Sequence, residues 1–268
     1  MKIVVITGST RGIGHGLADS FLALGCGVVI SGRTVKVIEE VRADLSLRYG
    51  AERVFDHPCD VTDFEQVEAL WNKAQGHFGK VDIWINNAGI SHAQMEFWKH
   101  TPEEIRAVVQ TNLMGMMHGC VVALQGMLEQ GFGSIYNMQG LGSDGRQMKG
   151  LTLYGSTKYG VAYLTTGLVK ETKGTAVVVG SLSPGMVVTD LLTSQYQERP
   201  EEWEQAKRIF NILADRVETV TPWLAERVLA NKKSGARIEW LNGRKMAWRF
   251  LSAPFRKRDL FGRDGVSI

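Results

Sequence analysis

The segment KIVVITGSTRGIG, residues 2–14, decides the fold of this 268-residue chain. Residues 2–6 are a short run of apolar, mostly β-branched side chains, which predicts one buried strand. Glycines punctuate residues 7–14, and apolar side chains then recur every three or four positions over residues 13–24, which predicts a helix with one buried stripe. A strand, a glycine turn and a helix N-terminus together present backbone N–H groups and a helix dipole to a pyrophosphate. An ordinary glycine-rich turn is the alternative.

The end of the next apolar run, residues 27–31, carries Gly32, Arg33 and Thr34. In dinucleotide-binding folds this strand end faces the adenosine ribose, where an acid selects the 2′-hydroxyl and an arginine accommodates a 2′-phosphate. This position holds Arg33 and no acidic residue. Arg11 of the glycine turn would approach the same end of the cofactor. Two guanidinium groups suit a phosphate by charge and by fork geometry. We therefore expect NADP(H) as the cofactor, the alternative being that both arginines face solvent.

Strand-like and helical runs alternate to about residue 180 of the chain. This order predicts an α/β fold, a doubly wound Rossmann-type three-layer sandwich with a seven-stranded parallel sheet. We expect one domain over residues 1–268, with a substrate lid at 190–222 and a basic, aromatic C-terminal extension at 243–268. Core packing alone is the other explanation for the apolar residues of the lid. Six runs join the first strand: 27–31, 53–57, 81–86, 134–138, 175–181 and 237–241.

Tyr154 and Lys158 stand four residues apart in LYGSTK, residues 153–158. On a helix, two such positions share one face. A free phenol has a pKa of about 10, and a fixed cation beside it lowers that pKa towards the range where proton exchange is useful. This spacing predicts an acid–base pair; taken alone, it also occurs on ordinary solvated helix faces.

These motifs together resemble those of the short-chain dehydrogenase/reductases over about residues 3–190. The glycine turn has the T-G-x-x-x-G-x-G spacing of that family, and four further motifs follow in the same order, at residues 59–62, 86–89, 111–113 and 183–189. The resemblance implies that one set of residues binds the cofactor: Gly8, Ser9, Thr10, Arg11, Gly12, Ile13, Gly14, Arg33, Thr34, Asp60, Val61, Asn87, Ala88, Gly89, Tyr154, Lys158, Pro184, Gly185, Val187 and Thr189.

The resemblance also implies individual roles. Asp60 would contact the adenine, and Asn86 to Gly89 would steady the central sheet. Asn112 would bend a long helix and hold a water that links the lysine to solvent. Tyr154 would donate a proton to a carbonyl oxygen while Lys158 lowers the tyrosine pKa and holds the nicotinamide ribose.

One position departs from the family pattern. Most members carry a serine thirteen residues before the tyrosine, where it hydrogen-bonds the substrate carbonyl, and here that position is Leu141. The nearest hydroxyl is Ser143, in the glycine-rich loop 137–145, and we assign it the role, the alternative being a loop serine without catalytic part. The expected catalytic residues are thus Asn112, Ser143, Tyr154 and Lys158.

The same loop is similar to that of the plant and algal chlorophyll b reductases. The pattern Asn-Met-x-Gly-x-Gly-Ser, residues 137–143, stands ahead of Tyr-Gly-Ser-Thr-Lys, residues 154–158. This similarity implies NADPH-dependent reduction of the 7-formyl group of chlorophyll(ide) b to hydroxymethyl, and so a hydrophobic tetrapyrrole substrate. Because one fold hosts many reactions, a general reductase of hydrophobic ketones or aldehydes and a non-catalytic NADP-sensing protein stay open.

Composition sets the remaining expectations. A net charge of +3 is too small to argue for nucleic acid, and the scattered Cys26, Cys59 and Cys120 predict reduced core residues and no metal site. The chain starts almost at its first strand, so we expect a cytoplasmic protein without a signal or transit peptide, or a plastid protein in mature form. No apolar run reaches the roughly 18 residues of a membrane span.

The basic and aromatic residues that crowd the last forty positions allow three interpretations. This stretch could lie on an anionic membrane, pack on a partner subunit or roof the active site. We expect a homodimer or a homotetramer.

Overall fold

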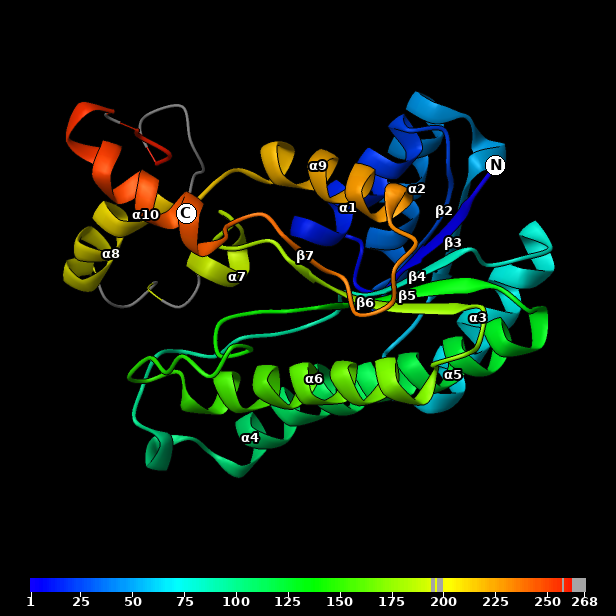
Figure 1. The fold of residues 1–268 in the computed structure, drawn as a ribbon, viewed down its shortest axis with the longest axis horizontal. Helices are drawn as coiled ribbons and strands as arrows, with labels where there is room; N and C mark the ends of the chain where they lie inside the picture. Colours follow the sequence, from blue (N-terminus) through cyan, green and yellow to red (C-terminus); the bar gives the residue numbers. More distant parts are fainter. Residues whose placement is uncertain (194–195, 197–199, 257, 262–268) are drawn as a thin grey trace.

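Seven parallel strands form one sheet in the order β3-β2-β1-β4-β5-β6-β7 (Figure 1). The structure is a computed structural model that describes residues 1–193, 196, 200–256 and 258–261. The strand order confirms the predicted doubly wound α/β fold, because it reverses between β1 and β4. The strands are β1 (Ile3–Ile6), β2 (Gly27–Gly32), β3 (Val54–Pro58), β4 (Ile83–Asn86), β5 (Gly133–Met138), β6 (Val177–Ser183) and β7 (Arg237–Glu239).

Helices cover both faces of this sheet (Figure 1). One face carries α1 (Gly12–Ala23), α2 (Val35–Tyr49) and α9 (Val217–Ala230), and the other carries α3 (Phe64–Phe78), α5 (Gly115–Gln130) and α6 (Thr152–Glu171). The remaining α-helices are α4 (Pro102–Val109), α7 (Asp190–Thr193), α8 (Pro200–Leu213) and α10 (Gly243–Ser252).

The central strand β1 explains why its sequence is continuously apolar. All four of its residues are buried. Val4 and Ile6 pack in the core on the α1 side, whereas Val5 packs in the core on the α5 side. Successive side chains of a strand point to opposite faces, and here both faces are covered by helices.

A helical stretch over residues 102–130 joins α4 and α5 through a π-helical turn, Gln110–Met114. Its best 18-residue window has a mean hydropathy of 1.4, enough by length and composition to cross a membrane. This differs from the expectation that no segment would pass such a test. Because 44% of that window is buried inside the protein, many of its apolar side chains pack in the core.

The helices α7, α8 and α10 gather beyond the carboxyl ends of the strands (Figure 1). The predicted lid, 190–222, takes in α7, α8 and the first turn of α9, with 194–195 and 197–199 outside the described residues. The α9 helix packs against α1, where an added Cβ on Gly16 would lie 2.3 Å from Val217. The segment over the strand ends therefore stops before α9.

Candidate active site

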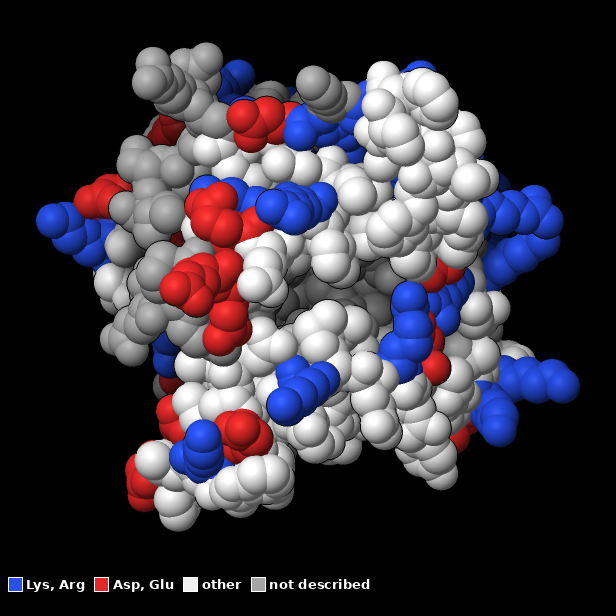
Figure 2. All heavy atoms as spheres, turned by 90° about the vertical axis from the view of Figure 1, so that its left-hand side faces the viewer, with Lys and Arg blue, Asp and Glu red and all other residues white. Residues whose placement is uncertain are grey.

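A cavity of about 620 Å³ lies at the carboxyl ends of the central strands. Its lining includes the turns after β1, β2, β3, β4, β5 and β6, together with residues of α6, α7, α8 and α10. Figure 2 shows the hollow on this face of the molecule. Ligands of doubly wound folds bind at this kind of edge, where the strand order reverses.

The glycine turn after β1 is shaped by close contact with the end of β4. Gly8 and Gly12 have φ angles of +63° and +55°, which side chains other than glycine rarely adopt. An added Cβ on Gly14 would lie 2.3 Å from the Gly8 carbonyl oxygen and 2.5 Å from Asn87 Nδ2. Arg11 at the N-cap of α1 makes no side-chain cap, so first-turn N–H groups stay available to an anion in the cavity.

The Asn86–Gly89 segment ties the central strands together. Asn87 Nδ2 donates to the carbonyl oxygens of Thr7 (2.9 Å) and Gly8 (3.0 Å). The N–H groups of Asn87 and Ala88 both donate to Thr7 Oγ1, at 3.0 and 3.1 Å. Asn86 Nδ2 donates to Asn137 Oδ1 at 2.9 Å, which adds β5 to this network.

Arg11, Arg33 and Thr34 all line the cavity. The Arg11 side chain is 76% exposed, and its NH1 lies 3.7 Å from Asp190 Oδ2. Ion pairs between exposed groups stabilise weakly, so this contact leaves Arg11 free to meet another anion. Asp60 lines the cavity as well, and its Oδ1 accepts from Thr62 N (3.0 Å) and Thr62 Oγ1 (2.9 Å).

Tyr154 and Lys158 both lie on α6 and line the cavity, as the four-residue spacing predicts. Lys158 is 4% exposed. Its Nζ lies 5.7 Å from the centre of the Tyr154 ring and donates to Met138 O at 3.3 Å. Burial raises the pKa of Tyr154 to about 12 and lowers the pKa of Lys158 to about 8.

The tyrosine pKa thus moves opposite to the sequence-based expectation. Desolvation disfavours both charged forms, and it is the one cause of the pKa shift at each residue. The buried site therefore favours a neutral phenol, which is the form that can donate a proton.

Asn112 lies in the π-helical turn and is fully buried. Its Oδ1 accepts from Ile90 N at 2.8 Å, and its Nδ2 donates to Ile90 O at 2.9 Å and to Thr157 Oγ1 at 3.3 Å. An added Cβ on Gly89 would lie 3.3 Å from Asn112 Oδ1 and 3.8 Å from Lys158 Nζ. The predicted asparagine and lysine are therefore close in space, although 46 positions apart in the chain.

Ser143 lies differently from its predicted place. Its Oγ donates to Lys158 O at 3.2 Å and accepts from Gly140 N at 3.0 Å, and the residue does not line the cavity. An added Cβ on Gly140 would lie 2.4 Å from the Tyr154 hydroxyl oxygen. Gly140 therefore occupies the place opposite the phenol, and the Ser143 hydroxyl braces the loop.

Gln139 is a cavity residue that is not among those predicted from the sequence. It lines the cavity and is 7% exposed, and its side-chain amide makes no hydrogen bond to any residue that the structure describes. Nothing in the spacing of the motifs marks Gln139. Only the fold of the loop places its polar group at the site.

Of the residues predicted from sequence, all but Ser9, Asn112 and Ser143 line the cavity. Ser9 is fully buried. Its Oγ donates to Ile6 O at 2.9 Å and accepts from Ser31 N at 2.8 Å. Its side chain thus joins β1 to β2. The loop residues Pro184, Gly185, Val187 and Thr189 also line the cavity, and an added Cβ on Gly12 of the glycine turn would lie 3.4 Å from Thr189 Cγ2.

Residues 2–200 match the short chain dehydrogenase family, and the chain belongs to that family of oxidoreductases. It is 38% identical over 258 residues to a chloroplastic chlorophyll(ide) b reductase of Arabidopsis thaliana, covering 93% of this chain and 72% of that protein. A probable chlorophyll(ide) b reductase of Oryza sativa subsp. japonica, also chloroplastic, is 35% identical over 99% of this chain, which spans 55% of its length. The solved structure of ElxO with NADP bound superposes with a TM-score of 0.79 at 26% identity, covering 92% of this chain and 99% of ElxO.

The buried lysine leads to a test of stability without any ligand. The Lys158 pKa falls from 10.5 to about 8 on folding, so below pH 8 the folded state must keep a charge that burial disfavours. This cost is full below pH 8 and disappears as the pH rises through 10.5, because the unfolded state then also loses its proton. Lys158→Met should therefore raise the melting temperature at pH 7, and raise it less at pH 10.

Thermal unfolding followed by circular dichroism checks this expectation. Lys170→Met, at an exposed position of the same helix, is the control and should change the melting temperature little at either pH. A gain for Lys158→Met that is equal at both pH values would contradict the assignment.

Proposed function

We propose that this protein is an NADPH-dependent carbonyl reductase that converts the 7-formyl group of chlorophyll(ide) b to 7-hydroxymethyl. The observation that carries the proposal is the similarity to chlorophyll(ide) b reductases over 93% of this chain, which includes the Tyr154–Lys158 pair and the loop opposite it. In the balanced reaction, one aldehyde, one NADPH and one proton give one primary alcohol and one NADP⁺.

The choice of NADP(H) rests on the charges around the adenosine end of the cavity. Arg33 follows β2 where NAD-selective folds place an acid, and Arg11 of the glycine turn lines the same cavity. The glycines of the turn carry no side chains that would block a pyrophosphate, and the N-terminus of α1, which has no side-chain cap, offers it N–H groups. Members of this family have been seen with this cofactor, including ElxO with NADP bound.

When bound, the nicotinamide supplies the hydride that reduces the carbonyl carbon. Tyr154, held neutral by burial, donates its proton to the carbonyl oxygen. Lys158 stabilises the phenolate left behind, because a cation favours a neighbouring anion in a buried site. Asn112 joins the segment after β4 to the π-helical turn through its hydrogen bonds to Ile90. It lies beside Lys158, which passes on a proton from solvent.

The carbonyl itself needs a second hydrogen-bond donor. Gly140 leaves the place opposite the phenol without a side chain, and the Ser143 hydroxyl is held by backbone groups. The Gln139 amide has free hydrogen-bonding capacity in the cavity. We propose that Gln139 takes the orienting part that the family pattern gives to serine, and that Ser143 supports the loop.

The outer part of the cavity suits a large apolar substrate. Its walls carry the apolar side chains of Met148, Leu151, Leu191, Leu192, Phe210, Leu213 and Met246. Binding sites of this kind gain affinity from apolar burial and orientation from a few polar groups. A flat tetrapyrrole fits this description, and so does another hydrophobic ketone or aldehyde, which is the second candidate substrate class.

A non-catalytic NADP sensor is the remaining alternative, and the closely placed Tyr154, Lys158 and Asn112 count against it.

The cellular location also follows from function: the relatives named above are chloroplastic, which favours the plastid over the cytoplasm if the substrate is the same.

The expected homodimer or homotetramer stays a prediction. It is supported by apolar side chains that α5 and α6 leave exposed, among them Met117, Val121, Tyr159 and Tyr163. Exposed apolar patches of this kind commonly mark protein–protein contacts.

Cofactor choice provides the first test of the proposal. Each charge-assisted hydrogen bond contributes about 1.5–3 kcal/mol, so Arg11 and Arg33 together should give NADPH a lead of about a hundredfold or more over NADH. Arg33→Asp should reverse the order, since it restores the acid that selects a ribose hydroxyl. Titration calorimetry with both cofactors measures this, and equal affinities for the wild type would contradict the assignment.

Substitutions opposite the cofactor test the catalytic roles. Tyr154→Phe should lower kcat by about 10²–10⁴-fold and leave NADPH binding nearly unchanged, because the hydroxyl acts on the carbonyl. Ser143→Ala should cost less than about tenfold in kcat, whereas Gln139→Ala should raise KM and lower kcat, as loss of an orienting donor does. Steady-state kinetics decide, and a larger loss for Ser143→Ala than for Gln139→Ala would return the orienting role to the serine.

Substrate class is tested by NADPH oxidation over a panel of carbonyl compounds. We expect chlorophyllide b to have a kcat/KM at least about a hundredfold above that of a small aromatic aldehyde. Remote apolar contacts contribute roughly 25 cal/mol per Å² buried, so about 110 Å² of added contact suffices for a hundredfold preference. Brisk turnover of small ketones with no reaction of chlorophyllide b would establish the general reductase instead.

A further inference from the structure

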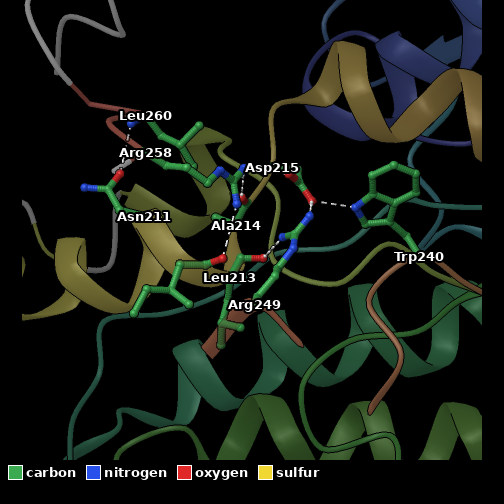
Figure 3. Close-up of polar contacts among 9 residues, drawn as sticks. Asn211, Leu213, Ala214, Asp215, Trp240, Arg249, Arg258 and Leu260 are labelled. Carbon is green, nitrogen blue, oxygen red and sulfur yellow. Dashed lines mark hydrogen bonds and ion pairs between the residues drawn. The ribbon is translucent and has the colours of Figure 1, made fainter. Parts of the chain in front are cut away.

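Asp215 is a buried carboxylate at which three distant parts of the chain meet. It lies between α8 and α9 and is 4% exposed. Its Oδ2 accepts hydrogen bonds from Trp240 Nε1 and Arg249 NH2, each at 2.6 Å, and its Oδ1 accepts from Arg258 NH2 at 2.7 Å (Figure 3). All three donors belong to the segment that follows β7.

The two arginines also bind the end of α8. Arg249 NH1 donates to Leu213 O at 2.8 Å. Arg258 donates to Ile212 O at 3.2 Å and to Ala214 O at 2.8 Å. The last carbonyl groups of a helix lack partners within the helix and carry the negative end of its dipole, so cations are favoured there. The cluster of Asp215, Arg249 and Arg258 therefore joins α8 to the C-terminal segment.

The backbone of Asp215 holds the loop on the cavity wall. Val188 N donates to Asp215 O, and Asp215 N donates to Met186 O, both at 3.0 Å. On its other side the loop meets the start of the C-terminal segment: Trp240 N donates to Ser183 O at 2.9 Å, and an added Cβ on Gly185 would lie 2.5 Å from Leu241 Cβ.

This arrangement makes the C-terminal segment part of the substrate wall. Leu260 is buried with Trp203 and Phe210 in a separate small core, and Leu260 N donates to Asn211 Oδ1 at 2.9 Å. Phe210 of α8 and Met246 of α10 line the cavity. The position of both helices thus depends on contacts that converge on one carboxylate.

We propose that Asp215 is a positioning residue that sets the substrate-size specificity of this enzyme. The carboxylate draws Arg249 and Arg258 together and fixes α8 and α10 as one wall of the cavity. The choice of chlorophyllide b as the large substrate rests on the proposed function, whereas the role of Asp215 in forming the wall does not.

Asp215→Asn tests this role, because it keeps the shape and backbone hydrogen bonds and removes the charge that the two arginines share. With NADPH saturating, KM for chlorophyllide b should rise at least tenfold, while kcat/KM for a small aromatic aldehyde should change less than threefold. The Kd of NADPH should also change less than threefold, because the Met186–Val188 loop keeps its main-chain bonds to residue 215.

Two further variants keep the test decisive. Arg258→Gln, at a side chain 32% exposed, removes one cation without leaving a buried charge alone and should raise the same KM in the same direction. Asp44→Asn breaks the exposed i,i+4 pair with Arg48 on α2 and should change none of these values. Equal losses with both substrates, or an unchanged KM for chlorophyllide b in a folded Asp215→Asn protein, would overturn the proposal.

Hydrogen exchange separates this outcome from failure of the proposed function. Asp215→Asn should speed amide exchange in α10 and at the end of α8, with NADPH present and no carbonyl compound. If the wild type leaves chlorophyllide b unreacted, the proposed function fails; faster exchange together with a changed preference between a bulky and a small ketone would still support the wall role. Exchange at the wild-type rate in both helices would refute it.

Discussion

The site depends on how closely the first glycine turn approaches the end of β4. Gly14 leaves no room for a Cβ between the Gly8 carbonyl and the Asn87 amide, and Thr7 Oγ1 accepts two N–H groups from the β4 side. These contacts hold the start of α1 over the carboxyl ends of the strands. The glycine turn and helix α6 consequently line one cavity.

Burial of Tyr154 and Lys158 has opposite consequences for stability and chemistry. Keeping a lysine in a dry place disfavours its charge, and its pKa falls to about 8. The same burial keeps the phenol neutral, and in the proposed reaction it strengthens the attraction between ammonium and phenolate once the proton has moved. A solvated pair would destabilise the folded state less, and it would be a poorer acid–base pair for the proposed reaction.

The C-terminal segment illustrates how a charge pattern alone leaves the contacts of its residues undecided. Its arginines and aromatic residues allowed a membrane-facing, a subunit-facing or a roofing interpretation. In the structure, Arg249 and Arg258 point into the protein, where they bind a buried carboxylate and carbonyl groups at the end of a helix. Four apolar side chains of the segment remain exposed: Trp248, Phe250, Leu251 and Phe255. One side of the segment therefore covers the cavity, and its other side stays available for contact.

Local sequence determined the elements and much of the site. The β-branched run at residues 3–6, the glycines of the turn and the Tyr154–Lys158 spacing act through backbone conformation and helix geometry, which depend on near neighbours. The parallel sheet followed because strands that alternate with helices along the chain are joined by helical crossovers.

Tertiary structure decided which way side chains point and what surrounds them. The direction of the Tyr154 pKa shift follows from burial. The fold of a glycine-rich loop determines that Ser143 hydrogen-bonds to backbone groups and that Gln139 lines the cavity. Asp215 meets Arg249 and Arg258 because segments 34 and 43 positions apart pack together. Desolvation and long-range contacts depend on the whole packed chain, so no local pattern in the sequence reveals them.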